Sequence, residues 1–131
     1  MIVDSSAMVA MLRKEPEARA MFAALTDEGS ASISAANYLE AAIVVDAKRD
    51  PVLSAKLDSL LAKLKIAIAP VTEAQARLAR QAYRDFGRGS GHPAKLNYGD
   101  CFAYALANER GEPLLYKGDD FAHAGMARAD V

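Results

Sequence analysis

The sequence predicts an α/β fold, an α/β/α sandwich whose short central sheet is mainly parallel. Short apolar runs alternate along the chain with longer segments whose apolar residues have helical spacing, which is typical of a parallel sheet with right-handed crossovers. Acidic residues also follow the first and the last of these apolar runs. Because such sheets bind ligands at the carboxyl ends of their strands, the acids stand where a site is expected.

Four short apolar runs predict the strands. In chain order they lie at 2–3, 31–34, 66–69 and 113–116. A turn is predicted after the last of them, at 117–121, and the weakly patterned tail leaves room for one more short strand.

The predicted helices have ends that can be recognised by residue type. Ser5 or Ser6 can cap the first helix, Pro16 suits the first turn of the second, and Thr72 can cap the fifth. In chain order the helices are expected at 7–14, 16–29, 35–49, 51–64, 72–87 and 98–110. Gly111 ends the last one, and a long loop is predicted at 87–97.

Composition limits the class of protein. The 131 residues suggest one domain, 1–131, that buries about two thirds of its extended surface. A net charge of -1, from 16 basic and 17 acidic residues, means that nucleic-acid binding would need a local basic patch. One cysteine excludes an intrachain disulfide, and no apolar segment approaches the roughly 18 residues of a membrane span. A soluble cytoplasmic protein with no membrane contact is expected.

Three acids stand alone in apolar segments. Asp4 is the only charged residue in 1–12, Glu40 is the only one in 29–45, and Asp100 is the only one in 96–108. A buried carboxylate is costly unless something compensates its charge, and no arginine or lysine lies within a turn of any of the three. The acids therefore either pair with distant basic residues or share a cation.

Each acid also has a simpler interpretation. Asp4 could be a helix N-cap, Glu40 could lie on an exposed helix face, and Asp100 could stand in a first turn, where the helix dipole favours acids. Taken together with the Asp119-Asp120 pair, they favour one shared site. All the candidate ligands are carboxylate oxygens, which suit Mg²⁺ or Mn²⁺ better than zinc. Carboxylates that hold one or two such ions are common in phosphodiester hydrolysis.

The order of these acids resembles that of the VapC-type PIN-domain ribonucleases, the toxins of type II toxin–antitoxin pairs. The matching tracts are IVDSSA, ANYLEAAIV, LNYGDCFAYALA and PLLYKGDDF, and the resemblance extends over nearly the whole chain. It implies a PIN-like fold and a Mg²⁺- or Mn²⁺-dependent endoribonuclease, often one that cuts tRNA or other structured RNA. It also implies a small VapB-like antitoxin, usually a homodimer, and contact with operator DNA only through the antitoxin complex.

The resemblance assigns roles to individual acids. Asp4 and Asp100 would be the principal metal ligands, and Glu40 would complete the cluster directly or through water. Asp120 is preferred as the fourth acid because an Asp-Phe pair usually closes this motif. Asp119 would be an alternative metal ligand, a residue that contacts the metal ligands from behind, or a solvated turn residue.

Supporting roles are weighed for several polar residues. Ser6 could bind a metal-bound water or cap a helix, and Asn97 could hold the substrate or a carboxylate, or cap the helix of Asp100. Lys117 could contact phosphate, offset the acidic charge, or simply be solvated. Arg88 and Lys95 are the best candidates for an RNA-contacting rim.

The remaining polar residues are expected to have no part in the chemistry. His92 would add to the rim only if protonated, His123 is expected on the surface, and Cys101 should pack as a small apolar side chain. Parts of the helices at 16–25 and 51–64 could form a groove for the antitoxin or a second subunit.

Three rival functions are considered. A phosphoacceptor receiver domain needs an acidic pair after its first strand and an aspartate after its third, whereas only Asp4 follows the first strand and IAIAP has no acid. A non-catalytic PIN module that acts through antitoxin and operator binding is disfavoured, because all the expected acids are present. A hydrolase of another phosphate ester remains the third alternative.

Overall fold

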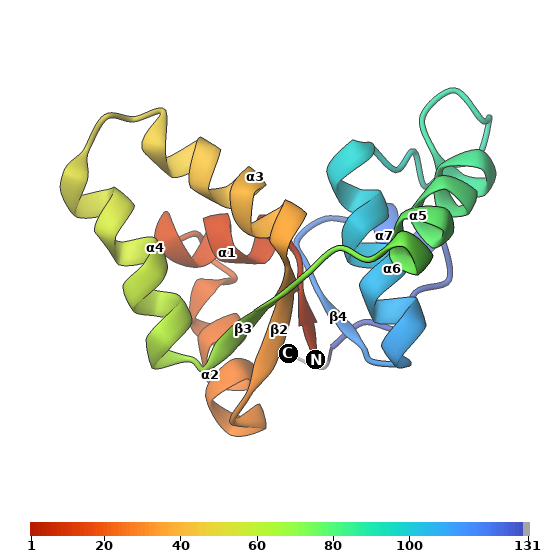
Figure 1. Ribbon diagram of the computed structural model, residues 1–131. Helices are drawn as coiled ribbons and strands as arrows, with labels where there is room; N and C mark the ends of the chain where they lie inside the picture. Colours follow the sequence, from red (N-terminus) through yellow and green to blue (C-terminus); the bar gives the residue numbers. More distant parts are fainter. Residues whose placement is uncertain (130–131) are drawn as a thin grey trace.

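The computed structural model describes residues 1–129 and has helices on both faces of a short parallel sheet (Figure 1). Within these residues the four strands pair in the order β3-β2-β1-β4, and every pairing is parallel. Their bounds are β1 Ile2–Val3, β2 Ala31–Ser34, β3 Ile66–Ala69 and β4 Leu114–Leu115. The predicted α/β/α sandwich is confirmed. A further short strand was considered for the tail. In the described part of the tail, up to residue 129, an isolated bridge between Leu114 and Arg128 stands in its place.

The helices follow the predicted order with small shifts at their ends. Their bounds are α1 Ser5–Leu12, α2 Ala18–Glu28, α3 Ala35–Asp46, α4 Pro51–Lys63, α5 Glu73–Phe86, α6 Tyr98–Arg110 and α7 Asp120–His123. None of the helices in the described part of the chain is long and apolar enough to span a membrane.

Three local predictions are wrong. Pro16 does not lie in the first turn of the second helix, since α2 begins at Ala18. Asp4, as its simpler interpretation proposed, and not Ser5 or Ser6, caps the first helix, because its extended backbone lets its carboxylate accept a hydrogen bond from the amide of Ser6. The turn predicted at 117–121 gives way at Asp120 to the short helix α7.

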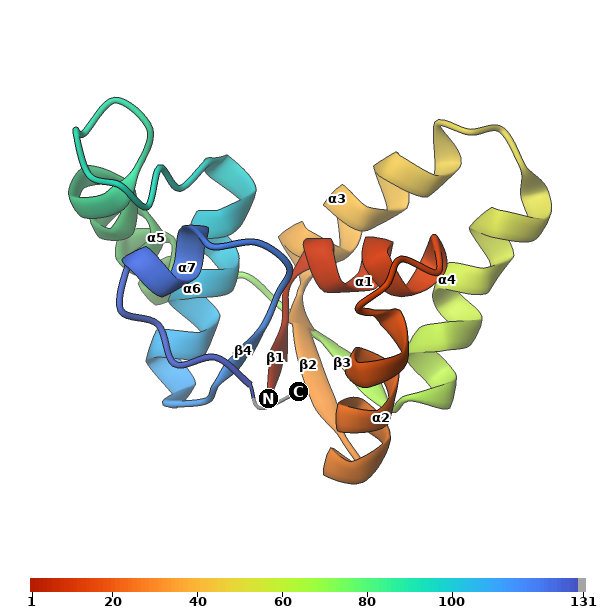
Figure 2. The ribbon, with the colours of Figure 1, turned by 180° about the vertical axis from the view of Figure 1, so that it is seen from behind.

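Successive residues of the neighbouring strands β1 and β4 point to opposite faces of the sheet. Val3 and Leu115 pack with α1–α4 on one face, while Ile2 and Leu114 pack with α5 and α6 on the other. Figures 1 and 2 show these two groups of helices on either side of the sheet, with α7 on the side of α5 and α6. The carboxyl ends of the strands therefore meet between the two layers, where residues from both can reach them.

Candidate active site

A pocket of about 440 Å³ opens where β1 and β4 end. Its walls come from α1, the α1–α2 loop, α3, the start of α6 and the segment after β4. The lining residues are Asp4, Ser5, Ser6, Val9, Arg13, Glu15, Glu40, Val44, Asn97, Asp100 and Lys117. The three isolated acids of the sequence are thus brought to one pocket from three different elements.

Asp4 is a buried carboxylate with one oxygen unused. Its side chain is 2% exposed, and Oδ2 accepts a hydrogen bond from the Ser6 amide at 2.9 Å, whereas the buried Oδ1 has no hydrogen-bond partner. Burial raises the pKa of Asp4 to about 7 against the opposing hydrogen bonds from Ser6, and the charges of Asp100 and Glu40 raise it further. A cation beside Oδ1 would offset all of these costs.

Asp100 is fixed by a capping box at the start of α6. Its amide donates to Oδ1 of Asn97 at 2.8 Å, and its own Oδ2 accepts from the Asn97 amide at 3.0 Å. Asn97 is therefore the N-cap residue, one of the two roles left open for it, and it also lines the pocket. This capping leaves Oδ1 of Asp100 available to a ligand.

The pKa of Asp100 reveals which other acids stand near it. Burial is the largest cause that raises this pKa, to about 6, and hydrogen bonding from Asn97 opposes it. The charges of Asp120 and Glu40 raise it further, and the charge of Arg88 lowers it. Asp120 is thus near enough to act on Asp100 electrostatically.

Glu40 is held by residues that the sequence interpretation missed. Its Oε1 accepts hydrogen bonds from Oγ of Ser5 and, at 3.3 Å, from Nδ2 of Asn37. The fully buried Asn37 also donates to the carbonyl of Gly99 at 2.9 Å and so ties α3 to the start of α6. One signal was available, since a polar residue three positions before Glu40 lies on the same face of an apolar helix.

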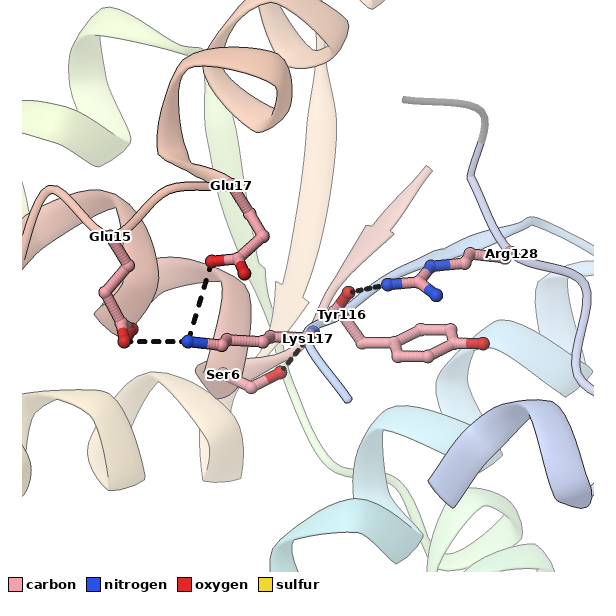
Figure 3. A network of polar contacts seen from close by, with 6 residues as sticks. All are labelled: Ser6, Glu15, Glu17, Tyr116, Lys117 and Arg128. Atoms are coloured by element: carbon pink, nitrogen blue, oxygen red, sulfur yellow. Dashed lines mark hydrogen bonds and ion pairs between the residues drawn. The ribbon is translucent and has the colours of Figure 1, made fainter. Parts of the chain in front are cut away.

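Ser6 joins the first helix to the segment after β4. Its Oγ accepts a hydrogen bond from the Lys117 amide at 3.0 Å, while its own amide binds Asp4. Figure 3 shows the Lys117 side chain between Glu15 and Glu17, to which its Nζ lies at 2.8 and 3.5 Å. The hydrogen bond to Glu15 is the largest cause of a raised Lys117 pKa. Lys117 is therefore paired with the α1–α2 loop and is not simply solvated.

The predicted basic rim lies beside Asp120. A second cavity, of about 640 Å³, is lined by Arg88, Gly89, Gly91, His92, Pro93, Lys95 and Asp120. Nδ1 of His92 accepts a hydrogen bond from the Ala94 amide at 3.1 Å. Asp119 lines neither this cavity nor the acidic pocket.

Two residues lie outside the polar chemistry of the pocket. Cys101 is buried, and its burial raises its thiol pKa to about 11, so that it packs as an uncharged small side chain. His123 is exposed on α7.

The donor set suits a divalent cation, but the predicted four-acid cluster is not preformed. Carboxylate oxygens are the ligands that Mg²⁺ and Mn²⁺ prefer, and the unpaired Oδ1 of Asp4 shares the pocket of Asp100 and Glu40. Within residues 1–129, however, no three His, Cys, Asp or Glu side chains converge closely enough to hold an ion as they stand. Glu40 is tied by hydrogen bonds to Ser5 and Asn37, and Asp120 lines the neighbouring cavity.

Comparison with known proteins agrees with this architecture. Residues 1–126 match the PIN domain family. The chain is 58% identical over 129 residues to ribonuclease VapC28 of Mycobacterium tuberculosis, which covers 98% of this chain and 97% of the relative. Ribonuclease VapC42 of the same organism is 46% identical over 129 residues, 98% of each chain.

The fold is also similar to that of a solved structure. The crystal structure of VapC20 from M. tuberculosis, a toxin that cleaves the sarcin–ricin loop, superposes with a TM-score of 0.75 over 99% of this chain and 98% of that one. The two sequences are 14% identical, so this likeness concerns the fold alone. The family match and the close relatives show that the chain belongs to the PIN-domain family and, within it, to the VapC ribonucleases.

Proposed function

We propose that the protein is a Mg²⁺- or Mn²⁺-dependent endoribonuclease, the toxin of a VapBC-like type II toxin–antitoxin system, which cleaves phosphodiesters of tRNA or other structured RNA in the cytoplasm. The proposal treats residues 1–131 as one PIN domain. The observation that carries it is the buried, unpaired Oδ1 of Asp4 beside Asp100 and Glu40, in a chain of the VapC type. Such an oxygen is costly to bury without a cation.

The role of each carboxylate follows from which of its oxygens are already hydrogen-bonded. Asp4 and Asp100 each give one oxygen to a helix cap and keep the other for the metal. Glu40 completes the site directly or through a water that its carboxylate orients, and Asp120 approaches from the neighbouring cavity. A bound Mg²⁺ or Mn²⁺ would lower the pKa of a water and offset the charge of the phosphate.

Basic residues around the pocket supply the contact with RNA. Arg88 and Lys95 line the cavity that holds Asp120, and Lys117 lines the acidic pocket itself. Because the net charge of the chain is -1, these local cations must offset the repulsion between RNA and the acidic cluster. Ser6 supports the site through its hydrogen bonds to Asp4 and to the segment of Lys117.

A homodimer is part of the proposal, and an exposed apolar face between α3 and α6 supports it. Leu39, Ile43 and Tyr98 are all largely exposed on this face, with Tyr98 at 79%. Tyr98 and Phe102 form a ridge, with one groove toward α3 and another toward α5. When two copies are related by a two-fold axis, the ridge of each copy can enter a groove of the other, which is the self-complementary contact that an isologous interface requires. A VapB-like antitoxin, which alone brings the pair to operator DNA, is the second partner.

The test is cleavage of total tRNA and ribosomal RNA by the purified protein with Mg²⁺, with Mn²⁺ and with EDTA. Asp100→Asn is the control, because asparagine keeps the shape and removes the charge. We expect discrete cuts that require the metal and disappear in the variant. Equal cutting by the variant would identify a contaminating nuclease and refute the proposal. Tight RNA or antitoxin binding without any cutting would instead support a non-catalytic module.

A further inference from the structure

The first observation concerns the direction in which Lys117 leaves the end of β4. Figure 3 shows its side chain pointing away from that of Tyr116, toward the α1–α2 loop. There Nζ donates to Oε2 of Glu15 at 2.8 Å and lies 3.5 Å from Oε2 of Glu17. The side chains of Lys117, Glu15 and Glu17 are 38%, 27% and 42% exposed, so the ion pair is partly open to solvent, although Oε2 of Glu17 is itself buried.

The second observation is that the pair stands in the wall of the acidic pocket. Lys117 and Glu15 both line it together with Asp4 and Asp100. The backbone of Lys117 is anchored there, because its amide donates to Oγ of Ser6 and the Ser6 amide donates to Asp4. The backbone from which the Lys117 side chain extends is therefore fixed beside Asp4, at the wall of the acidic pocket.

The net negative charge of the pocket explains why an RNA phosphate would bind Lys117. Four acids line it, namely Asp4, Glu15, Glu40 and Asp100, against the two cations Arg13 and Lys117. An RNA phosphate that enters meets net negative charge and needs a cation. Two carboxylates already neutralise the charge of Lys117. Ion pairs that are partly exposed to solvent are weak, however, and an ammonium group has three N–H donors. A phosphate can therefore take the place of a carboxylate.

We propose that Lys117 binds a backbone phosphate of the RNA beside the scissile one, and that Glu15 and Glu17 compete with that phosphate for the ammonium group. The two glutamates then set the affinity of the site for RNA, with the ion pair exchanged when substrate binds. This inference rests on the proposed RNA-cleaving function and adds the residues that tune its substrate binding.

The test is a double-mutant cycle on RNA binding. Fluorescently labelled tRNA is titrated with Asp100→Asn protein, which keeps the RNA intact, and with the same protein carrying Glu15→Gln, Lys117→Met or both. We expect Glu15→Gln to tighten binding by about two- to fivefold, Lys117→Met to weaken it, and Glu15→Gln to have no effect once Lys117 is methionine. Glu73→Gln is the matched control, since Glu73 forms an exposed ion pair with Arg77 on α5.

Two results would overturn the inference. If Glu15→Gln tightens binding equally with and without Lys117, the effect is general repulsion of RNA. If it lowers the thermal midpoint but leaves the affinity unchanged, the ion pair only ties two loops together. RNA cleavage by protein with Asp100 intact tests the proposed function separately. If that protein cuts RNA but the variants at Glu15 and Lys117 all bind RNA with equal affinity, only the role of Lys117 is refuted.

Discussion

The carboxylate of Glu40 packs directly against the backbone of Gly99. A Cβ atom at position 99 would lie 2.6 Å from Cδ of Glu40, closer than real Cβ contacts allow. Glycine is needed here for close approach rather than for an unusual backbone angle, since residue 99 lies within α6. The position of the predicted catalytic acid Glu40 thus depends on Gly99, the residue before Asp100.

The first prediction tests this packing with Gly99→Ala. The added methyl group should displace Glu40 and reduce RNA cleavage on the order of tenfold to a hundredfold, as misplaced catalytic groups do. Cleavage kinetics and thermal unfolding of the variant would be measured together. The thermal midpoint should also fall, because a displaced Glu40 loses its hydrogen bonds to Ser5 and Asn37. In a Glu40→Ala background the same change should not lower it further, and a persistent loss of stability there would contradict the steric explanation.

The second prediction concerns the buried amide of Asn37. Asn37→Asp replaces a donor by an acceptor that faces the Gly99 carbonyl and the Glu40 carboxylate, both of which need a donor. We expect the free energy of unfolding to fall by about 1–3 kcal/mol, measured by urea titration. Asn108→Asp, at an exposed position of α6, should have little effect. Equal losses in the two variants would exclude a special role for Asn37.

The third prediction is a pH dependence of stability without metal. The pKa of Asp4 in the folded protein is about 7, above the ordinary aspartate value of 3.8, so between these values the folded state binds more protons than the unfolded state. Stability should therefore fall as the pH rises from 4 to 7. The change should reach about 3 kcal/mol for Asp4 alone, and Asp100, with a pKa of about 6, should add to it.

Urea unfolding at pH 5 and pH 8 in EDTA would measure this dependence. Asp4→Asn should remove most of this dependence and leave the part that Asp100 contributes, since asparagine does not titrate and remains a good helix cap. Saturating Mg²⁺ should also flatten it, because a bound cation favours the charged carboxylate. A wild-type stability that rises from pH 5 to pH 8 in EDTA would contradict the burial of Asp4.

The fourth prediction tests the apolar face between α3 and α6. Tyr98→Ser removes the most exposed side chain of the ridge and should shift the protein from dimer toward monomer in analytical ultracentrifugation. Val52→Ser is the control, because Val52 is similarly exposed on α4. If both variants sediment like the unchanged protein, the dimer forms elsewhere or not at all.

Much of the fold and part of the candidate site could be predicted from local sequence. The alternation of apolar runs and helices predicted the parallel sheet, and the isolation of Asp4, Glu40 and Asp100 predicted that they share a pocket. These predictions succeeded because periodicity and unpaired charge are visible within one or two helical turns. Their roles in metal binding remain predictions.

What local sequence could not decide are contacts between distant segments. Asn37 meets Gly99 across 62 positions of the chain, and Lys117 meets Glu15 across 102. Nothing around Lys117 predicts that its charge is taken by the α1–α2 loop rather than by Asp119 or Asp120. Local composition identified the groups that are too costly to bury alone. The partners of these groups depend on tertiary packing, because a buried charge is compensated by whatever the two helical layers bring within hydrogen-bond distance.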